Sequence, residues 1–200
     1  MSDERKDLEK RFFIYPQTTV CVKDFEAEGH ILDIGGGGEG IIGKLKPDQV
    51  VAIDLRKREL EEAGPGPLQI IMDARDLQFL DGSFRNVTAF YSLMYVRSNS
   101  DQQQVFHEIA RVLKPGGRFL CWDVRASTQP EGESREMYLV FLRIQYAAGR
   151  EVNTGYAQPW PETTRDAEHY TRLAQTAGLQ LVSTERQEHL FFLQFEKPAA

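Results

Sequence analysis

The chain has 200 residues, of which 41% are apolar and 27% charged, and its formal net charge is −6. This length suits one α/β domain with a sizeable core and is short for two domains. The acidic balance argues against a nucleic-acid partner, which needs a basic face. No apolar run approaches the roughly eighteen residues of a membrane span.

The N-terminal segment is charged and lacks the apolar stretch of a signal peptide. We therefore expect a cytoplasmic protein with no membrane partner. Cys21 and Cys121 lie far apart, and no Cys/His cluster surrounds either one. Neither a metal site nor a disulfide is predicted from them.

Short β-branched runs alternate with amphipathic segments over the first two thirds of the chain. Strands are predicted at residues 30–34, 49–53, 68–72, 86–91 and 118–124. Helices are predicted at residues 41–45 and 56–63, and from Ser100-Asp101 to the stop at Lys114-Pro115-Gly116-Gly117. Strand, helix and strand in this order imply right-handed crossovers and a mostly parallel sheet.

The last third of the chain has a different pattern. Residues 127–134 predict a polar loop, and residues 137–148, apolar nearly all round, predict a helix that covers the active site or forms a dimer face. Residues 153–163 predict another loop. A helix from about Thr164 to a cap at Gly178 precedes a hairpin of residues 179–186 and 190–196.

The segment Ile31-Leu32-Asp33-Ile34-Gly35-Gly36-Gly37-Gly38-Glu39-Gly40 carries the most information. A strand that runs into glycines and then a helix lets the backbone approach a ligand closely. Gly35, Gly37 and Gly40 satisfy the dinucleotide pattern GxGxxG, and Asp54 follows at the distance expected for a ribose-binding acid. Spacing alone therefore allows either NAD or S-adenosylmethionine.

Two carboxylates help to separate these cofactors. Asp33 precedes the first glycine by two residues, and Glu39 lies inside the loop. A pyrophosphate is repelled by nearby carboxylates, whereas the ammonium and sulfonium of S-adenosylmethionine are attracted. The alternative for Asp33 is a turn carboxylate, because Asp is favoured in turns.

With these residues identified, the chain resembles the class I (Rossmann-like) S-adenosylmethionine-dependent methyltransferases of the methyltransferase type 11-like group. ILDIGGGGEG is similar to the motif that holds the methionine end of the cofactor, and VVAIDLRKRELEEA to the motif whose acid binds both ribose hydroxyls. Met72-Asp73-Ala74 is similar to the element in which Asp accepts from the adenine amino group, and residues 90–95 occupy the fourth motif. The cofactor residues that the resemblance implies are Asp33, Gly35, Gly36, Gly37, Asp54, Leu55, Asp73, Ala74 and Phe90.

The resemblance also implies a fold: a doubly wound, mostly parallel seven-stranded sheet whose last strand is antiparallel and inserted beside the fifth. We expect one methyltransferase domain over residues 1–200, with an N-terminal cap at 1–29 and a substrate-side insertion at 125–165. The chain departs from the family pattern at Glu39, which replaces the third glycine, and at Arg85, where Asp is frequent. Met94-Tyr95 stands where many members have a His pair, so a mechanism that relies on those histidines does not transfer.

Substrate is expected at the carboxyl ends of the strands, near residues 11–15 and 127–163. Tyr95 and Asp123 are the candidates for substrate contact. The alternative for Tyr95 is an amphipathic residue at a helix start, and the alternative for Asp123 is a turn carboxylate. No catalytic residue is assigned. Trp160 either covers the pocket or pins a loop, with the second favoured. The histidines are expected to be solvated (His107, His169) or structural (His189).

The sequence thus predicts a methyltransferase that acts on a small or medium-sized molecule by in-line displacement, with S-adenosylmethionine as cofactor. A homodimer is a further expectation. Two alternatives stay open: a non-catalytic subunit that binds S-adenosylmethionine, supported by the altered glycine loop, and an NAD-binding oxidoreductase, supported by GxGxxG.

Overall fold

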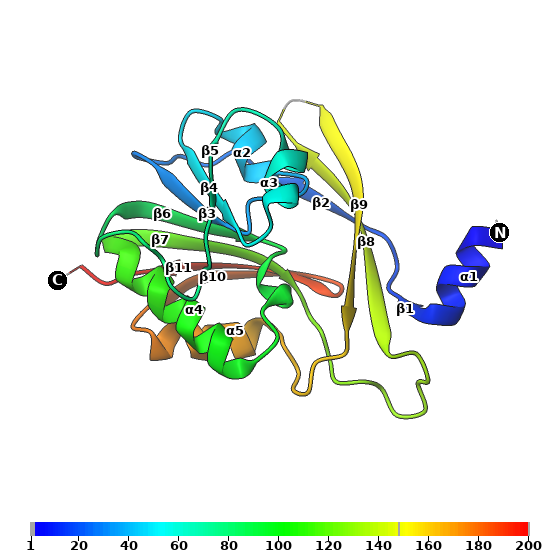
Figure 1. Cartoon of the computed structure of the whole chain (residues 1–200). Helices are drawn as coiled ribbons and strands as arrows, with labels where there is room; N and C mark the ends of the chain where they lie inside the picture. Colours follow the sequence, from blue (N-terminus) through cyan, green and yellow to red (C-terminus); the bar gives the residue numbers. More distant parts are fainter. Residues whose placement is uncertain (1–2, 148, 200) are drawn as a thin grey trace.

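The main sheet has seven strands in the order β10-β11-β7-β6-β3-β4-β5 (Figure 1). The computed structural model describes residues 3–147 and 149–199. The strands are β3 (Ile31–Ile34), β4 (Val50–Asp54), β5 (Leu68–Ile71), β6 (Phe84–Phe90), β7 (Leu113–Val124), β10 (Gln180–Gln187) and β11 (Leu190–Glu196). All neighbouring pairs from β7 to β5 are parallel, and β11 is antiparallel to both β7 and β10. The predicted fold, including the antiparallel last strand beside the fifth, is confirmed.

Helices cover both faces of this sheet (Figure 1). On one face, α4 (Asn99–Val112) and α5 (Ala167–Thr176) pack on Leu32, Ile34 and the inner side of β11. On the other, the short helices α2 (Ile41–Leu45) and α3 (Lys57–Ala63) bury Ile42 and Leu60 against Ile31 and Val50. Ile31 and Leu32 face opposite sides because successive side chains of a strand alternate.

A second sheet lies beside the first and contains the elements that the sequence assigned wrongly. It consists of β1 (Phe12–Ile14), β2 (Thr18–Val22), β8 (Met137–Tyr146) and β9 (Arg150–Pro159), and α1 (Asp3–Arg11) precedes it. β8 was expected to be a helix and most of β9 a loop; both are strands, paired antiparallel along their whole length. The predicted helix end at residue 148 lies outside the described residues.

The physical reason is visible in the burial of β8. Leu142, Ile144 and Tyr146 are buried, whereas Arg143 and Gln145 between them are exposed. This is the two-residue period of a strand with one covered face, and the apolar start of the segment hides it. β1 and β2 lie one after the other along the same edge of β8, both parallel to it.

Several boundaries also differ from those predicted. α4 begins two residues earlier than expected, with Ser98 as its N-cap accepting from the Asp101 amide at 3.0 Å. α5 begins at Ala167, capped by the Asp166 carboxylate, and Gly178 follows its end with a φ of 88°. These shifts are of the size expected where capping chemistry, not periodicity, sets the helix end.

Candidate functional site at the glycine loop

The glycine loop leaves the carboxyl end of β3 at the point where the strand order reverses. β3 pairs with β4 on one side and with β6 on the other. The Ser92 hydroxyl, just after β6, donates to the Ile34 carbonyl at 2.6 Å. A Cβ on Gly35, which has a φ of 68°, would lie 2.4 Å from the Ser92 Cβ. Such a switch point is where open α/β sheets bind ligands. Glycine is required at position 35 because of its positive φ and because the Ser92 side chain leaves no space for a Cβ.

Asp33 lies beneath the loop and not on its surface. Its side chain is in the core, 2% exposed, and the Thr88 hydroxyl donates to Oδ1 at 2.6 Å. Burial, with a contribution from the charge of Asp54, raises the pKa of Asp33 to about 7. A Cβ on Gly36 would come within 2.6 Å of Asp33 Oδ2. Asp33 therefore supports the loop from below in this structure.

Asp54 ends β4 and faces the loop from the side. Its Oδ1 accepts from the Arg56 amide at 2.9 Å. A Cβ on Gly37 would lie 2.9 Å from Asp54 Oδ2, so the loop backbone comes close to this carboxylate. Leu55 beside it is 62% exposed, an unusual position for a large apolar side chain. An acceptor oxygen next to an exposed apolar surface suits a ribose and an adjoining base.

Asp73 and Ala74 follow β5 at the same end of the sheet. The Asp73 carboxylate is held by Arg75, whose Nη2 lies 2.6 Å from Oδ2 and whose Nε lies 3.0 Å from both oxygens. The guanidinium lowers the pKa of Asp73. Arg75 also reaches Asp101 on α4 at 3.2 Å. Asp73 therefore lies at the same end of the sheet as the glycine loop, and its oxygens are engaged within the chain.

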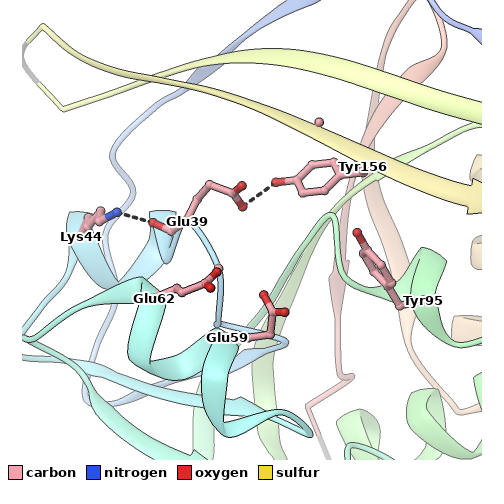
Figure 2. A pocket seen from close by; sticks show the side chains of 8 residues that line it. Glu39, Lys44, Glu59, Glu62, Tyr95 and Tyr156 are labelled. Carbon is pink, nitrogen blue, oxygen red and sulfur yellow. Dashed lines mark hydrogen bonds between the residues drawn. The ribbon is translucent and has the colours of Figure 1, made fainter. Parts of the chain in front are cut away.

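A hollow with a volume of about 390 Å³ opens between the glycine loop and the second sheet. It is lined by Gly38, Glu39, Lys44, Glu59, Glu62, Tyr95, Gly155 and Tyr156. Figure 2 shows Tyr95 and Tyr156 on one side and the three carboxylates on the other, with Lys44 at the rim. Burial raises the pKa of Tyr95 to about 12, so this phenol stays neutral at physiological pH.

The other candidates lie apart from this hollow. Asp123 is fully buried, and its carboxylate accepts from the Val124 amide at 2.7 Å and from the Tyr170 hydroxyl at 3.1 Å. It also accepts from the backbone of Met94, so it holds the short 3-10 helix Leu93–Tyr95 that carries Tyr95. Phe90 packs edge-on against Tyr91, with ring centroids 4.8 Å apart.

The aromatic and histidine side chains have mainly structural contacts. Trp160 donates to the Arg135 carbonyl at 2.8 Å and packs on Phe13 and Tyr138, which pins the segment after β9. His107 is exposed, as expected. The expectation for His169 was wrong: it is buried, with Nε2 2.8 Å from Gln102 Oε1. His189 is buried and stacks on Tyr15, with ring centroids 4.6 Å apart.

Two residues were missed by the sequence interpretation: Tyr156, which lines the hollow, and Thr154, which contacts the lining residue Glu39. Thr154 and Tyr156 lie on β9, in the segment expected to be a loop, and both donate to the Glu39 carboxylate. The signal that points to them is the alternation of Val152, Thr154 and Tyr156 with more polar or smaller residues. Across the described residues, no group of three or more His, Cys, Asp or Glu side chains is arranged to hold a metal ion.

The fold and the loop at its switch point define the class: this is a protein with the class I S-adenosylmethionine-dependent methyltransferase fold. Residues 32–121 match the family model described as a methyltransferase domain. This match agrees with the motifs and confirms the resemblance drawn from them.

Similar proteins agree with this assignment. A ubiquinone/menaquinone biosynthesis C-methyltransferase of Desulfotalea psychrophila is 36% identical over 104 residues, covering 48% of this chain and 41% of that protein. A demethylmenaquinone methyltransferase of Listeria monocytogenes is 31% identical over 168 residues, covering 82% of this chain and 65% of its own length. The chain thus spans about two fifths to two thirds of the length of these relatives.

Among solved structures, a methyltransferase from Methanosarcina mazei superposes with a TM-score of 0.62 at 17% identity. The match covers 88% of this chain and 95% of that one, and establishes the shared fold. In the described part of the chain, no helix is long and apolar enough to cross a membrane.

Proposed function

We propose that this protein is an S-adenosylmethionine-dependent methyltransferase that transfers a methyl group to a small or medium-sized molecule by in-line displacement. The observation that carries the proposal is the cradle at the switch point. It combines a glycine loop that leaves no space for a Cβ at residues 35–37, the Asp54 carboxylate beside it, and the exposed Leu55. These features lie inside the segment that matches the methyltransferase domain.

The residues of this cradle fit the proposed cofactor. Asp54 Oδ2 is an acceptor for ribose hydroxyls, Leu55 offers an apolar surface to adenine, and the loop places backbone groups against the methionine portion. When bound, S-adenosylmethionine supplies an electrophilic methyl group on a good leaving group. The chain then has to hold the acceptor in line and exclude water, which by proximity alone contributes several kcal/mol.

The hollow beside the loop is the proposed acceptor site. Its volume of about 390 Å³ lies in the range of small-molecule pockets. Tyr95 provides an apolar ring and a neutral hydroxyl there. An acceptor that must lose a proton would transfer it to one of the lining carboxylates, since the pKa values of both lining tyrosines are raised by burial.

The type of acceptor is supported by the names of two relatives, a ubiquinone/menaquinone biosynthesis C-methyltransferase and a demethylmenaquinone methyltransferase. A small aromatic molecule with an activated ring carbon is therefore the first class of acceptor to examine. The single domain over residues 1–200, the cytoplasmic location, the homodimer and the absence of a nucleic-acid partner stay predictions from the sequence.

The test is calorimetric titration with S-adenosylhomocysteine of the wild type, Asp54→Ala and the control Asp48→Ala. Asp48 is an exposed residue of the turn before β4. We expect micromolar binding to the wild type and the control. Loss of charge-assisted hydrogen bonds should weaken binding to Asp54→Ala by roughly 10-fold or more.

Two results would redirect the proposal. No binding of S-adenosylhomocysteine to the wild type, together with saturable binding of NADH, would replace it with the oxidoreductase alternative. Binding without turnover across a panel of aromatic acceptors would favour the non-catalytic subunit.

A further inference from the structure

Glu39, the residue that interrupts the glycine pattern, is directed out of the loop toward the second sheet. It lies between Gly38 and Gly40, which have φ values of 60° and 55°. Left-handed backbone on both sides is accessible to glycine at little cost. The loop thereby turns twice, and Glu39 itself needs no left-handed conformation. The Lys44 ammonium holds its carbonyl at 2.5 Å, and the side chain extends across the hollow (Figure 2).

The Glu39 carboxylate is bound by two hydroxyls of β9. Thr154 donates to Oε1, and Tyr156 donates to Oε2 at 2.9 Å. Thr154 and Tyr156 are two positions apart, so they lie on the same face of the strand. Each carboxylate oxygen thus receives its own donor, in the charge-assisted form that makes hydrogen bonds short and strong.

Tyr156 also contacts the main sheet. Its ring is buried and stacks on Tyr91, with centroids 5.8 Å apart. Tyr91 precedes Ser92, whose hydroxyl binds the Ile34 carbonyl at the start of the glycine loop. The loop is therefore connected to the wall of the hollow at two points, through Glu39 and through residues 91–92.

We propose that Glu39 is a positioning residue that links the cofactor loop to the Tyr156 wall of the acceptor hollow, so that occupancy of the loop and order of β9 depend on each other. This inference rests on the proposed function, because it takes the glycine loop as the cofactor site. Any linkage of this kind is reciprocal: a ligand that favours the fixed loop favours the fixed wall by the same factor. A structural role alone would predict lower stability and no response of β9 to a ligand at the loop.

The test combines a double-mutant cycle with hydrogen exchange. Glu39→Gln, Tyr156→Phe and the double variant are titrated with S-adenosylhomocysteine, with Glu61→Gln as a matched change of charge. Glu61 pairs with Lys57 on the exposed side of α3 and does not line the hollow. Exchange is followed in the peptide covering residues 150–159, with and without S-adenosylhomocysteine.

We expect each single variant to bind about fivefold or more weakly, at the lower end of typical coupling. The double variant should be no weaker than the weaker single one, because both remove the same contact. S-adenosylhomocysteine should slow exchange at residues 150–159 in the wild type and in Glu61→Gln, and should leave it unchanged in the other variants. Should Glu39→Gln fail to fold, Thr154→Val and Tyr156→Phe test the contact from the β9 side.

The possible outcomes distinguish the linkage from the proposed function on which it rests. The linkage would be overturned if the variants bound S-adenosylhomocysteine as tightly as the wild type and if the ligand slowed exchange at residues 150–159 equally in both. The proposed function would then still stand. Additive losses in the double variant would also overturn it. No binding to the wild type would overturn the proposed function and the linkage with it.

Discussion

Arg75 fills the hydrogen-bonding capacity of Asp73 in the free protein. Asp73 Oδ1 accepts from the Arg75 amide and Nε, and Oδ2 accepts from Nε and Nη2. A carboxylate oxygen offers about two lone-pair positions, so an adenine amino group at this acid must displace part of the guanidinium. The adenine role that the resemblance implies for Asp73 therefore competes with an internal ion pair.

At the residue scale, we predict that Arg75→Ala binds S-adenosylhomocysteine up to about fivefold more tightly than the wild type. The Arg75 side chain is 45% exposed, and ion pairs that solvent screens in this way are weak, which limits the gain. Calorimetry at constant ionic strength measures it. Weaker binding by Arg75→Ala would show instead that the guanidinium itself contacts the ligand.

At the scale of elements, α4 is tied to the connection between β5 and β6 by one arginine. Arg111 donates to the carbonyls of Leu77 and Phe79 at 2.7 and 2.8 Å. It also pairs with Glu108 at 2.7 Å, and Glu108 Oε2 accepts from the Leu77 amide at 2.7 Å. This connection contains no helix of its own, so these bonds fix it together with the core packing of Leu77.

We predict that Arg111→Met lowers the free energy of unfolding by about 2 kcal/mol, because it leaves a largely buried carboxylate and two carbonyls without their donor. Arg85→Met is the control: its exposed pair with Glu28 should matter by less than about 0.5 kcal/mol. Urea unfolding of both variants measures the difference. Equal small losses would show that α4 is held by its apolar face alone.

At the scale of the whole molecule, two carboxyls are buried in the main sheet. Burial is the main cause that raises the pKa of Asp33 and of Asp123 to about 7. A carboxyl whose pKa is raised on folding keeps its proton in the folded state while the unfolded chain releases it. Stability from such a group is present below the unfolded pKa of about 4 and is lost as the pH rises toward 7.

We predict that Asp123→Asn gains stability relative to the wild type as the pH rises from 5 to 7, at about 1 kcal/mol per pH unit. An amide cannot ionise, so the variant does not lose stability through ionisation of a buried carboxyl as the pH rises. Urea unfolding at pH 5, 6 and 7 checks it, with the exposed Asp48→Asn as control. Parallel pH profiles for Asp123→Asn and the wild type would contradict a raised pKa at Asp123.

The sequence by itself determined the features that depend on local periodicity and spacing. The strands and helices of the parallel sheet, the glycine loop and the terminal hairpin could all be predicted, since apolar runs and capping residues are read within one segment. The family resemblance supplied the strand order. The resemblance likewise implied that Asp54, Leu55 and Asp73 belong to the cofactor site, and in the structure these residues end or follow β4 and β5, which are parallel neighbours.

Only the tertiary structure decided the second sheet and the acceptor side of the site. β8 is a strand because β1 and β2 on one edge and β9 on the other supply its hydrogen-bond partners, and such partners are not visible within the segment itself. Asp123 is buried by Tyr170, from a helix 47 positions away. Glu39 finds its donors 115 and 117 positions along the chain. Contacts over such separations depend on how complete elements pack, and the residues near Glu39 in the sequence do not determine them.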